Sequence, residues 1–304
     1  MQLTGQLVKL KNMVNNRILI FGYGYCAKAL IKKFQNKKSK ILVVSRNSQN
    51  IDKLNSQGIK SCYWSREDDV KNFINKSNTI LITAPPNNFV DPVASKYSKY
   101  FALTGNKIRL IYLSSTSVYG DHKGAWVNEN SKLKANSELG KWRLKVETDW
   151  LSFAKSNSLS ISVLRLSGIY GLGRSAFDRI SSKSFKIVKS PNILFSRIHI
   201  DDIAIIIQKF IDNENLKGVY NLSDNMPATS EAIYLEAFRL LKLDPPTSKN
   251  LDELNLSKTA MGFFSESKKV CNKKLLNNLN YKLIHPDYFS GMKDIFKKLK
   301  KKFR

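Results

Sequence analysis

The chain has 304 residues, of which 42% are hydrophobic and 11% aromatic, so it can form one large domain or two modest ones with a substantial core. It contains no run of the roughly 20 apolar residues that a membrane-spanning helix needs. Lys9 and Lys11 interrupt the apolar residues at its start, which argues against a signal peptide. The three cysteines match no metal-ligand spacing, and they indicate reduced thiols in a cytoplasmic protein without a metal site.

Basic residues dominate the charge. Lysine and arginine outnumber aspartate and glutamate by 51 to 24, which gives a formal net charge of +27. One interpretation is a polyanionic partner, either nucleic acid or an anionic membrane. The other is a solvated lysine surface, since the lysines are scattered through every segment beside Asn and Ser. Because no recognised nucleic-acid-binding motif accompanies the charge, we favour the solvated surface and expect no specific nucleic-acid partner.

A glycine-containing turn follows the first predicted strand, Ile18 to Phe21. In this Gly-x-Gly-x-x-Ala turn, Gly22 permits a tight exit from the strand and Gly24 lets the backbone approach a pyrophosphate. Ala27 is small enough for the next helix to pack against the sheet, and the N-terminus of that helix attracts phosphates. We therefore expect this turn to bind a dinucleotide through Gly22, Gly24, Tyr25, Cys26 and Ala27.

The second predicted strand, Ile41 to Val44, ends in Ser45 and Arg46. An acidic residue about 20 positions after the glycines would bind the ribose 2′-hydroxyl of NAD, whereas an arginine suits the 2′-phosphate of NADP. Arg46 therefore favours NADP over NAD, with Ser45 as a second donor. The alternative is that Arg46 is an ordinary solvated arginine of a basic chain.

Strands and helices alternate along the rest of the chain, which predicts a doubly wound α/β Rossmann fold with about seven parallel strands. The further predicted strands are Ile59 to Trp64, Thr79 to Thr83, Ile108 to Leu113, Ile161 to Leu166 and Val219 to Leu222. Three helices are predicted by their ranges: Gln49 to Gln57, Ser137 to Lys155 and Ser230 to Lys242. Two more are predicted by their ends: one is capped by Asp68 or Asp69 and ends at Lys76, and one is capped by Asp91 and closed by Gly105. A further helix is opened by residues 197–203.

Ligands bind at the carboxyl edge of such a sheet. The strand ends at Gly22, Ser45, Ala84, Ser115 and Ser167 should meet there, so we add Ala84, Pro85, Ser114 and Ser167 to the expected cofactor-binding residues. The expected domains are an extension at 1–16, a Rossmann domain at 17–170 and a small substrate lobe at 171–304. This lobe is interleaved with late Rossmann elements at about 198–224 and ends in a basic helix.

With these motifs in this order, the chain resembles the extended short-chain dehydrogenase/reductases, the NAD(P)-dependent epimerase/dehydratase family. The resemblance rests on the glycine turn, on Ser-Thr-Ser-Val-Tyr-Gly at 115–120, and on segments 165–174, 197–203, 220–224 and 267–272. It implies an N-terminal part folded around NAD(P), with a smaller substrate lobe built from later segments.

The family's chemistry uses a serine or threonine, a tyrosine, and a lysine four residues after the tyrosine. Ser115 matches the serine, but Leu139 stands at the tyrosine position and Arg143 replaces the lysine, on a helix face that we expect to point inward with Val146 and Trp150. Leucine has no proton to transfer, and arginine keeps its proton near neutral pH. We therefore predict Ser115 and Arg143 as catalytic residues of an atypical site that lacks its acid–base pair.

Other polar residues lie near the predicted edge, and several of them allow two interpretations. Tyr119 and Tyr170 could replace the missing acid, although such tyrosines more often pack. His199 is expected to be structural, and Asp202 to cap the helix that follows it. Arg174 and Arg197 could bind a substrate phosphate or form surface salt bridges.

The C-terminal residues 297–304 are strongly basic, with Ile295, Leu299 and Phe303 at helical spacing. They predict either a docked terminal helix or an amphipathic helix with weak membrane-surface contact. The resemblance implies reduction, epimerisation or dehydration of a small molecule such as a nucleotide sugar. The alternative is a non-catalytic NADP-binding regulator or sensor, and a homodimer is compatible with either.

Overall fold

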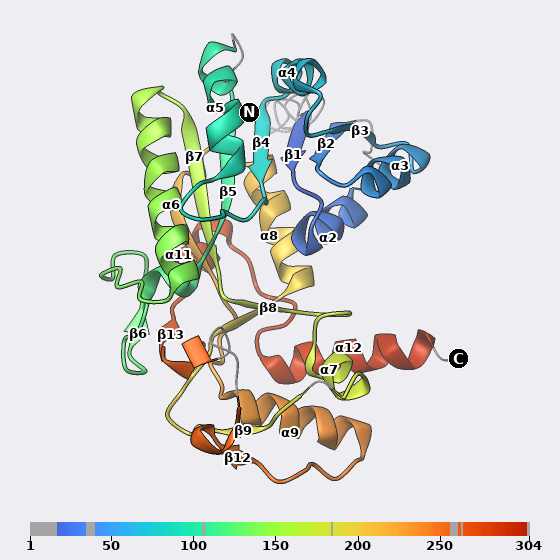
Figure 1. The fold of residues 1–304 in the computed structure, drawn as a ribbon, viewed down its shortest axis with the longest axis vertical. Coiled ribbons are helices and arrows are strands. Elements are labelled where there is room, and N and C mark those ends of the chain that lie inside the picture. Colours follow the sequence, from blue (N-terminus) through green and yellow to red (C-terminus); the bar gives the residue numbers. More distant parts are fainter. Residues whose placement is uncertain are drawn as a thin grey trace, which may run out of the picture. The chain divides into compact units, whose positions relative to one another are not determined.

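The computed structural model describes residues 17–34, 40–104, 107–183, 185–255, 261–262 and 264–302. Its largest element is a seven-stranded parallel sheet with strand order β3-β2-β1-β4-β5-β7-β11 (Figure 1). The predicted fold class and all seven predicted strands are confirmed. The strands are β1 (Ile18–Phe21), β2 (Ile41–Ser45), β3 (Lys60–Tyr63), β4 (Thr79–Ile82), β5 (Arg109–Ser115), β7 (Ser160–Leu166) and β11 (Gly218–Leu222).

The strand order reverses at β1. The chain moves outward in one direction through β2 and β3 and then returns to the other side of β1 with β4 and β5. Ile18 pairs with Ile41 of β2 and with Thr79 of β4, both in parallel register. In open α/β sheets a ligand binds outside the carboxyl ends of the strands at this kind of reversal. The fold therefore directs attention to the ends of β1, β2 and β4.

Six helices connect the strands, and each was predicted from the sequence. They are α2 (Tyr25–Lys33), α3 (Ser48–Ser56), α4 (Glu67–Asn75), α5 (Pro92–Leu103), α6 (Glu138–Ser156) and α8 (Ile200–Asp212).

Two predicted caps had different outcomes. The Asp91 carboxylate accepts a hydrogen bond from Val93 N at 2.7 Å and caps α5, as predicted. The predicted cap of α4 was wrong, because the N-cap residue is Arg66 and the helix begins at Glu67. Asp68 and Asp69 lie in its first turn, where their charges interact favourably with the helix dipole. Gly105 lies outside the described residues.

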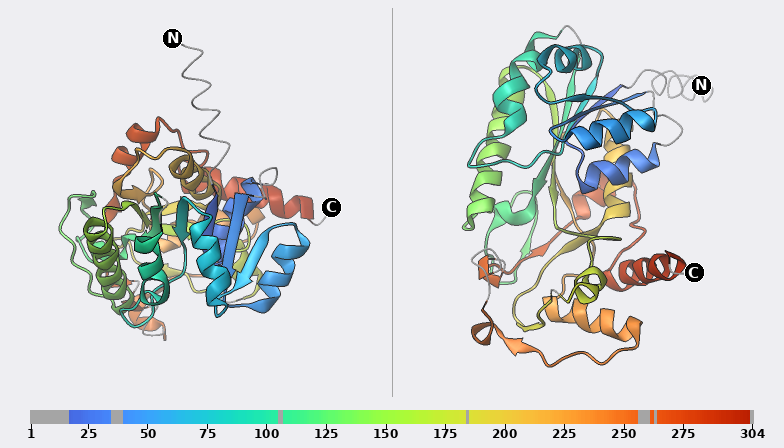
Figure 2. Two further views of the ribbon diagram at one scale, coloured as in Figure 1. Left: turned by 90° about the horizontal axis from the view of Figure 1, so that it is seen from above. Right: turned by 45° about the vertical axis from the view of Figure 1, so that its right-hand side comes forward.

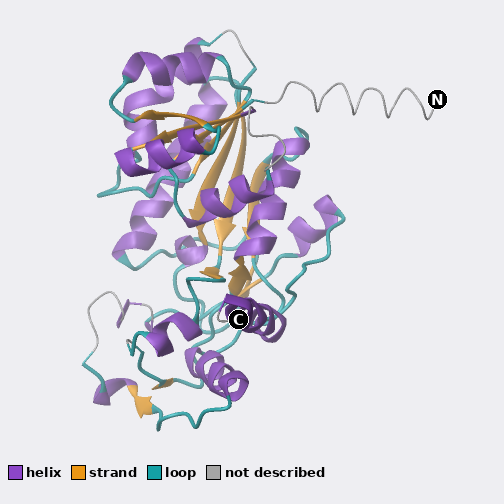
Figure 3. Ribbon diagram, turned by 90° about the vertical axis from the view of Figure 1, so that its right-hand side faces the viewer, coloured by secondary structure: helices purple, strands orange, loops and turns teal. Residues whose placement is uncertain are grey.

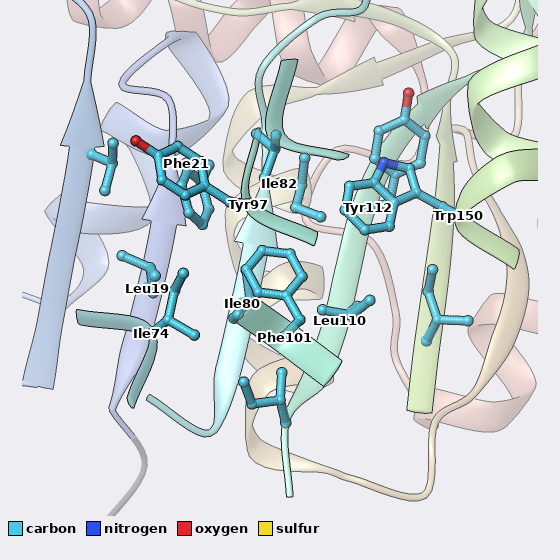
Figure 4. Close-up of a cluster of buried hydrophobic side chains, with 14 of the residues drawn as sticks. Leu19, Phe21, Ile74, Ile80, Ile82, Tyr97, Phe101, Leu110, Tyr112 and Trp150 are labelled. Carbon is cyan, nitrogen blue, oxygen red and sulfur yellow. The ribbon is translucent and has the colours of Figure 1, made fainter. Parts of the chain in front are cut away.

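One face of the sheet is covered by α4, α5 and α6. Figure 4 shows Phe21 beside Tyr97 and Phe101, with Trp150 beside Tyr112. Side chains of alternate strand residues point to this face because successive residues of a strand point to opposite sides. The face buries a large apolar and aromatic area, and such burial is the main favourable term in folding.

The opposite face is covered by α2, α3 and α8, and the strands lie between the two helical layers (Figure 2, left). Every residue of β1, β2 and β4 is buried, which is why these strands read as continuous apolar runs in the sequence. None of the described helices combines the length and the apolar character that crossing a membrane demands.

The chain divides into two compact units, each built from several segments. Unit 1 holds the chain up to Ser114 together with Lys145–Leu164 and Ala204–Val219, and unit 2 holds Ser115–Leu144, Arg165–Ile203 and the chain from Tyr220 onward. Five elements therefore contribute to both units, namely β5, α6, β7, α8 and β11. The predicted domain boundaries stay a proposal.

Unit 2 contains several short strands that the sequence analysis did not predict (Figure 3). They form three parallel pairs: β6 (Trp126–Val127) with β13 (Lys269–Val270), β8 (Gly168–Tyr170) with β10 (Arg197–His199), and β9 (Val188–Lys189) with β12 (Lys249–Asn250). Strands of two or three residues are too short to show a periodic pattern. Its further helices are α7 (Ala176–Ser181), α9 (Ser230–Leu241), α11 (Lys273–Leu279) and α12 (Tyr288–Lys302).

The C-terminal helix α12 is docked. Met292 and Ile295 are buried in one cluster with Tyr234 and Phe238 of α9, and Leu299 packs against the same cluster. The docked alternative for this basic helix is therefore the one that the structure shows. Phe303 lies outside the described residues.

Candidate functional site

Gly22 ends β1 in a conformation that only glycine fits. Its φ is +100°, and a Cβ built on it would lie 2.7 Å from Oγ1 of Thr83. Thr83 in turn donates two hydrogen bonds of 3.0 Å to the Phe21 carbonyl, one from its amide and one from its hydroxyl. The glycine turn is therefore held against the end of β4.

Gly24 precedes α2 and leaves room for a ligand. It has an ordinary φ of −86°, and a Cβ built on it would meet nothing within 4 Å. Helix α2 begins with Tyr25, Cys26 and Ala27, and no acidic residue stands in its first turn. A helix N-terminus without an acidic side chain or a side-chain cap favours an anion. These residues fit the pyrophosphate of a dinucleotide.

Arg46 lies on a fixed turn after β2. The buried Ser45 hydroxyl accepts a hydrogen bond from Asn47 N at 3.2 Å, and the Asn47 side chain caps α3 by accepting from Asn50 N at 3.2 Å. Arg46 itself is exposed. Ser45 thus shapes the turn that presents Arg46 at the carboxyl edge, which suits a phosphate partner.

The ends of β4 and β5 complete this edge of unit 1. Ala84 is half-buried and Pro85 is exposed. The Ser114 hydroxyl is buried and donates a 2.7 Å hydrogen bond to the buried Glu147 carboxylate of α6. Ser114 therefore braces β5 against α6 from within, and its part in cofactor binding stays a prediction.

In unit 2, Ser115 begins a short 3-10 turn, Thr116–Tyr119. The Ser115 hydroxyl accepts a hydrogen bond from Ser117 N at 3.2 Å. Gly120 closes the turn with a φ of +66°, and a Cβ there would lie 1.9 Å from the Lys134 carbonyl oxygen. The close packing at Gly120 therefore restricts the backbone conformation of the turn, and the turn holds Ser115 in place.

Gly140 brings the start of α6 against this turn. It is buried, and a Cβ built on it would lie 2.9 Å from the Ser117 carbonyl oxygen and 2.9 Å from Oγ of Ser137. Leu139 and Arg143 are carried on the same two helical turns as Gly140. The positions of the serine, the missing tyrosine and the missing lysine are thus assembled within unit 2.

This arrangement of fold and site matches a known family. A model of the NAD dependent epimerase/dehydratase family matches residues 18–223. The chain belongs to this family. The match runs from the first strand to the end of β11, so it includes every predicted site residue of both units.

Individual proteins are also similar to this chain. YeeZ of Escherichia coli is 27% identical over 180 residues, which are 59% of this chain and 59% of that protein, so the chain spans about three fifths of the length of the curated relatives it matches. A functionally unknown conserved protein from Silicibacter pomeroyi is 30% identical, with a TM-score of 0.85 over 93% of this chain and 99% of that one. MoeE5, solved with UDP-glucuronic acid and NAD, shares the fold: it is 16% identical, with a TM-score of 0.75 over 94% of this chain and 100% of its own.

Leu139 stands at the position of the tyrosine that serves as acid and base in the family. Leu139 is 54% exposed, so the prediction that it belongs to the inward face of α6 was wrong, whereas Val146 and Trp150 are buried as predicted. Leu139 lies in the first turn, where α6 extends past the sheet core and into unit 2. Leucine at this position has no proton to transfer.

Tyr119 does not replace the missing acid. It is fully buried, its hydroxyl donates to Asn221 Oδ1 at 2.7 Å, and it accepts from the Arg165 guanidinium at 2.9 Å. Burial raises its pKa, although the Arg165 charge opposes that shift. The Asn221 amide nitrogen of the main chain donates to Glu129 at 2.8 Å, so the tyrosine belongs to a network that ties segments of unit 2 together.

Tyr170 is packed in a similar way. It is buried, its ring stands edge-on to His199 at 5.1 Å, and burial raises its pKa. A Cβ at Gly291 of α12 would lie 2.2 Å from its hydroxyl, so α12 closes directly over it. Tyr119 and Tyr170 are therefore both packed side chains, which is the second of the two interpretations given above.

Arg197 holds the backbone rather than a phosphate. Its guanidinium donates to the carbonyl oxygens of Phe195 and Ala228, both at 2.9 Å, and to that of Thr229 at 3.3 Å. Burial lowers its pKa to about 10. Neither predicted role of Arg197 fits this geometry. Arg174 is exposed in the turn before α7.

Ser167 and Asp224 are buried polar groups in the interior of unit 2. Ser167 donates its amide to the Leu222 carbonyl at 3.0 Å, and no hydrogen bond to its hydroxyl is found among the described residues. Asp224 is 1% exposed, and burial raises its pKa to about 7. Ser167 stays a predicted cofactor ligand.

Asp202 does not cap α8, because the helix already starts at Ile200. Its buried carboxylate instead accepts hydrogen bonds from the Tyr281 hydroxyl and from the amides of Ile284 and His285 at 2.7, 2.8 and 3.0 Å. The sequence could not show this, because the partners lie about 80 residues away. Asp202 fastens the segment before α12.

His199 is structural, as predicted, and it belongs to a cluster that the sequence analysis missed. His199, Asp201, His285 and Asp294 offer ligand atoms that lie within 4.8 Å of one another. The Lys298 ammonium of α12 lies 2.8 Å from Asp201 and 2.6 Å from Asp294, so one positive charge already pairs with both carboxylates. Burial next to His285 lowers the pKa of His199 to about 4, which keeps it neutral.

Proposed function

We propose that this protein binds NADP(H) at the carboxyl edge of unit 1 and acts on a nucleotide-sugar-like substrate as a reductase, epimerase or dehydratase. The observation that carries the proposal is the combination of Gly22, Gly24 and Arg46. Gly22 permits the turn, Gly24 leaves open space before a helix without acidic residues in its first turn, and Arg46 is exposed beside it. That set suits a pyrophosphate and a 2′-phosphate together.

The residues of unit 2 supply only part of the family's chemistry. When bound, the nicotinamide ring gives or takes a hydride. The Ser115 hydroxyl accepts a hydrogen bond from Ser117 N and keeps its own hydrogen, so it can donate to a substrate oxygen. Arg143 supplies a positive charge that binds hydroxyl or phosphate groups but transfers no proton near neutral pH. We therefore expect slow turnover.

The nucleotide-sugar class is supported by the family and by the fold shared with MoeE5, whose structure holds UDP-glucuronic acid. The test is a screen of the purified protein with NADPH or NADP against UDP-sugars and small carbonyl compounds, followed by cofactor absorbance. Turnover of a UDP-sugar that falls in Ser115→Ala supports the proposal. Turnover of small carbonyl compounds alone contradicts the substrate class.

A non-catalytic NADP-binding regulator is the second candidate. The observation that favours it is Leu139, exposed at the acid–base position, together with Tyr119 and Tyr170, both buried with raised pKa values. Tight NADPH binding with no turnover of any compound would select the regulator. The cytoplasmic location, the homodimer and weak membrane-surface contact stay proposals of the sequence alone.

A further inference from the structure

Four side chains with metal-binding atoms gather at one place in unit 2. His199 ends β10, and Asp201 lies in the first turn of α8. His285 precedes α12, and Asp294 lies on that helix. Each side chain offers one ligand atom, and these atoms lie within 4.8 Å of one another. The expectation of no metal site rested on the cysteines, and this cluster is built without them.

The two imidazole rings are buried and held in place. Their centroids lie 4.0 Å apart, and the Tyr170 ring stands edge-on to His199 at 5.1 Å. The buried Asp202 carboxylate accepts a hydrogen bond from the His285 amide at 3.0 Å, which fixes the backbone there. Support of this kind orients metal ligands in advance, because the rings need not be ordered when an ion binds.

Each imidazole faces one carboxylate across a gap. Nδ1 of His199 lies 3.9 Å from Oδ2 of Asp201, and Nε2 of His285 lies 4.0 Å from Oδ2 of Asp294. Both distances are too long for a hydrogen bond. Nδ1 of His199 accepts a hydrogen bond of 3.2 Å from the Asp201 amide, so this nitrogen carries a lone pair rather than a hydrogen. That amide lies in the first turn of a helix, where amides also bond to water, so the lone pair can pass to a metal ion.

The spacing of these atoms suits a small ion. Zinc bonds of about 2.0–2.2 Å to nitrogen and oxygen place tetrahedral ligands about 3.4 Å apart, so each His–Asp gap must close by about half an ångström. The Asp201 and Asp294 side chains are 31% and 29% exposed, so they have room to rotate toward an ion. Imidazole and carboxylate ligands without a thiolate match the preferences of Zn²⁺.

The Lys298 ammonium marks the side from which an ion would enter. It lies 2.8 Å from Asp201 and 2.6 Å from Asp294, and its side chain is 42% exposed. A position for a cation between the two carboxylates is therefore already built, and it reaches solvent. The ammonium brings one charge on a flexible stem, whereas a zinc ion brings two charges and also binds imidazole nitrogen.

We propose that His199, Asp201, His285 and Asp294 bind Zn²⁺ in a four-coordinate structural site, and that the ion displaces the Lys298 ammonium from the two carboxylates. The two carboxylates balance the charge of the ion, the imidazoles bind as neutral rings, and the ammonium leaves with its protons. The site joins the start of α8 to α12, so zinc should hold the C-terminal helix in place. This inference is independent of the proposed function, because it uses none of the predicted cofactor or catalytic residues.

The test measures zinc binding by calorimetry on the metal-free full-length protein, with Co²⁺ as a second probe. Tetrahedral cobalt absorbs visible light much more strongly than the hydrated ion, so its spectrum reports the coordination. We expect one equivalent to bind, with the spectrum of a four-coordinate site. Asp294→Asn and His285→Gln should each weaken zinc binding by at least the roughly 10–100-fold that loss of an outer-shell partner costs.

Lys298→Met separates a metal site from a simple ion pair. It removes the competing ammonium, so it should bind zinc about tenfold more tightly than the wild type, or better, as expected when a charge-assisted contact no longer competes. Without metal it should melt below the wild type, because the carboxylates lose a partner, and zinc should restore its melting temperature. Lys297→Met, exposed on the same helix, and His122→Gln, outside the cluster, are the matched controls and should leave zinc affinity unchanged.

Failure of both the wild type and Lys298→Met to bind zinc or cobalt would overturn the site. Zinc binding that Asp201→Asn and Asp294→Asn leave unchanged would reveal an adventitious ion elsewhere and would overturn it as well. Equal zinc affinity of the wild type and Lys298→Met would overturn the displacement of the ammonium. These three variants change partly exposed side chains, so they decide the question even where the buried His285→Gln does not fold.

Discussion

The glycine turn of unit 1 and the start of α6 in unit 2 both depend on a closely packed glycine, but they differ in how far the neighbouring side chains match the expected functional pattern. Each depends on a glycine at which an added Cβ would collide with a neighbouring segment, Gly22 with Thr83 and Gly140 with Ser117. In unit 1 that glycine opens a Gly-x-Gly-x-x-Ala turn, the pattern typical of dinucleotide-binding turns. In unit 2 the packing is kept, and the acid and base beside it are replaced by Leu139 and Arg143.

This difference shows that the packing of the backbone at a glycine and the identity of the neighbouring side chains can vary independently. Gly140 secures a packing contact, and that contact persists whatever side chain stands beside it. Leu139 is exposed and Arg143 is half-buried, so we expect the side chains at these positions to matter less for stability than Gly140. A family match therefore establishes the fold and the cofactor edge more firmly than it establishes turnover.

Restoring the pair should give the largest effect. The double variant Leu139→Tyr/Arg143→Lys should raise the rate with the best substrate by about 10²–10⁴-fold, the usual value of a positioned general acid or base. Leu139 is exposed and Arg143 is half-buried in the first two turns of α6, so the fold should accept both changes. Steady-state kinetics measure the gain.

The matched control is Leu139→Phe/Arg143→Lys, which restores the ring and the lysine without the hydroxyl. It should show no gain. An equal gain in both variants would mean that the tyrosine hydroxyl is not what the site lacks.

The two glycines of the cofactor turn should separate folding from binding. Gly22→Ala should lower the free energy of unfolding by about 2–4 kcal/mol, because its Cβ collides and its φ is positive. Gly24→Ala should leave stability nearly unchanged, since its Cβ would meet no atom within 4 Å, yet it should weaken NADPH binding. Urea unfolding and calorimetry measure the two effects, and a Gly24→Ala protein that binds NADPH normally would refute the open-space argument.

Arg46 should set the choice of cofactor. Arg46→Ala should weaken NADPH binding by about 1–3 kcal/mol, the range of a charge-assisted contact, and leave NADH binding unchanged. Calorimetric titration of both cofactors checks this, with Lys40→Ala as a control for the loss of one charge nearby in the chain. Equal affinity of the wild type for NADPH and NADH would count against Arg46 as the phosphate ligand.

The buried charges of unit 2 should affect stability with pH but not cofactor binding. Folding raises the pKa of Asp224 to about 7, so the folded state binds the extra proton and loses stability as pH rises toward 7. Folding lowers the pKa of His199 to about 4, so stability is lost as pH falls below about 6.5. The two effects oppose each other between these values.

Asp224→Asn removes the first effect. The variant should be more stable than the wild type above pH 7 by about 1–2 kcal/mol, discounted from the full shift because buried groups relax. It should also lose stability on acidification more steeply than the wild type. Chemical unfolding across pH checks both statements, and a stability gap that does not change with pH would contradict them.

Much of the fold could be predicted because its signals are local. The buried strands read as apolar runs, Gly22 and Gly24 mark the turn, and Asp91 with Pro92 marks a helix start. What could not be predicted depends on partners far apart in the chain. Asp202 meets residues near 284, and Tyr119 meets Asn221 across about 100 residues. The short strands of unit 2 form only because tertiary packing aligns them.

The same distinction between local signals and contacts distant in sequence applies to the candidate site. The residues of the cofactor turn were predicted from spacing alone, and Leu139 and Arg143 were singled out by their departure from a family pattern. The exposure of Leu139 was not foreseen, because a periodic pattern shows which residues share a helix face but not where that helix leaves its core. The packing role of Arg197 was likewise hidden, since its three carbonyl partners belong to other segments.

The central proposal is that the chain binds NADP at the carboxyl edge of unit 1, and that Leu139 and Arg143 in place of the tyrosine and lysine leave it without an acid–base pair. The most direct test is a single-turnover experiment in which the wild-type protein, loaded with NADPH, is mixed with UDP-sugars and small carbonyl compounds while bound cofactor is followed by its absorbance. We predict that NADPH binds tightly and is consumed slowly or not at all. Rapid consumption that is undiminished in Ser115→Ala would contradict the account, because another residue would then supply the proton.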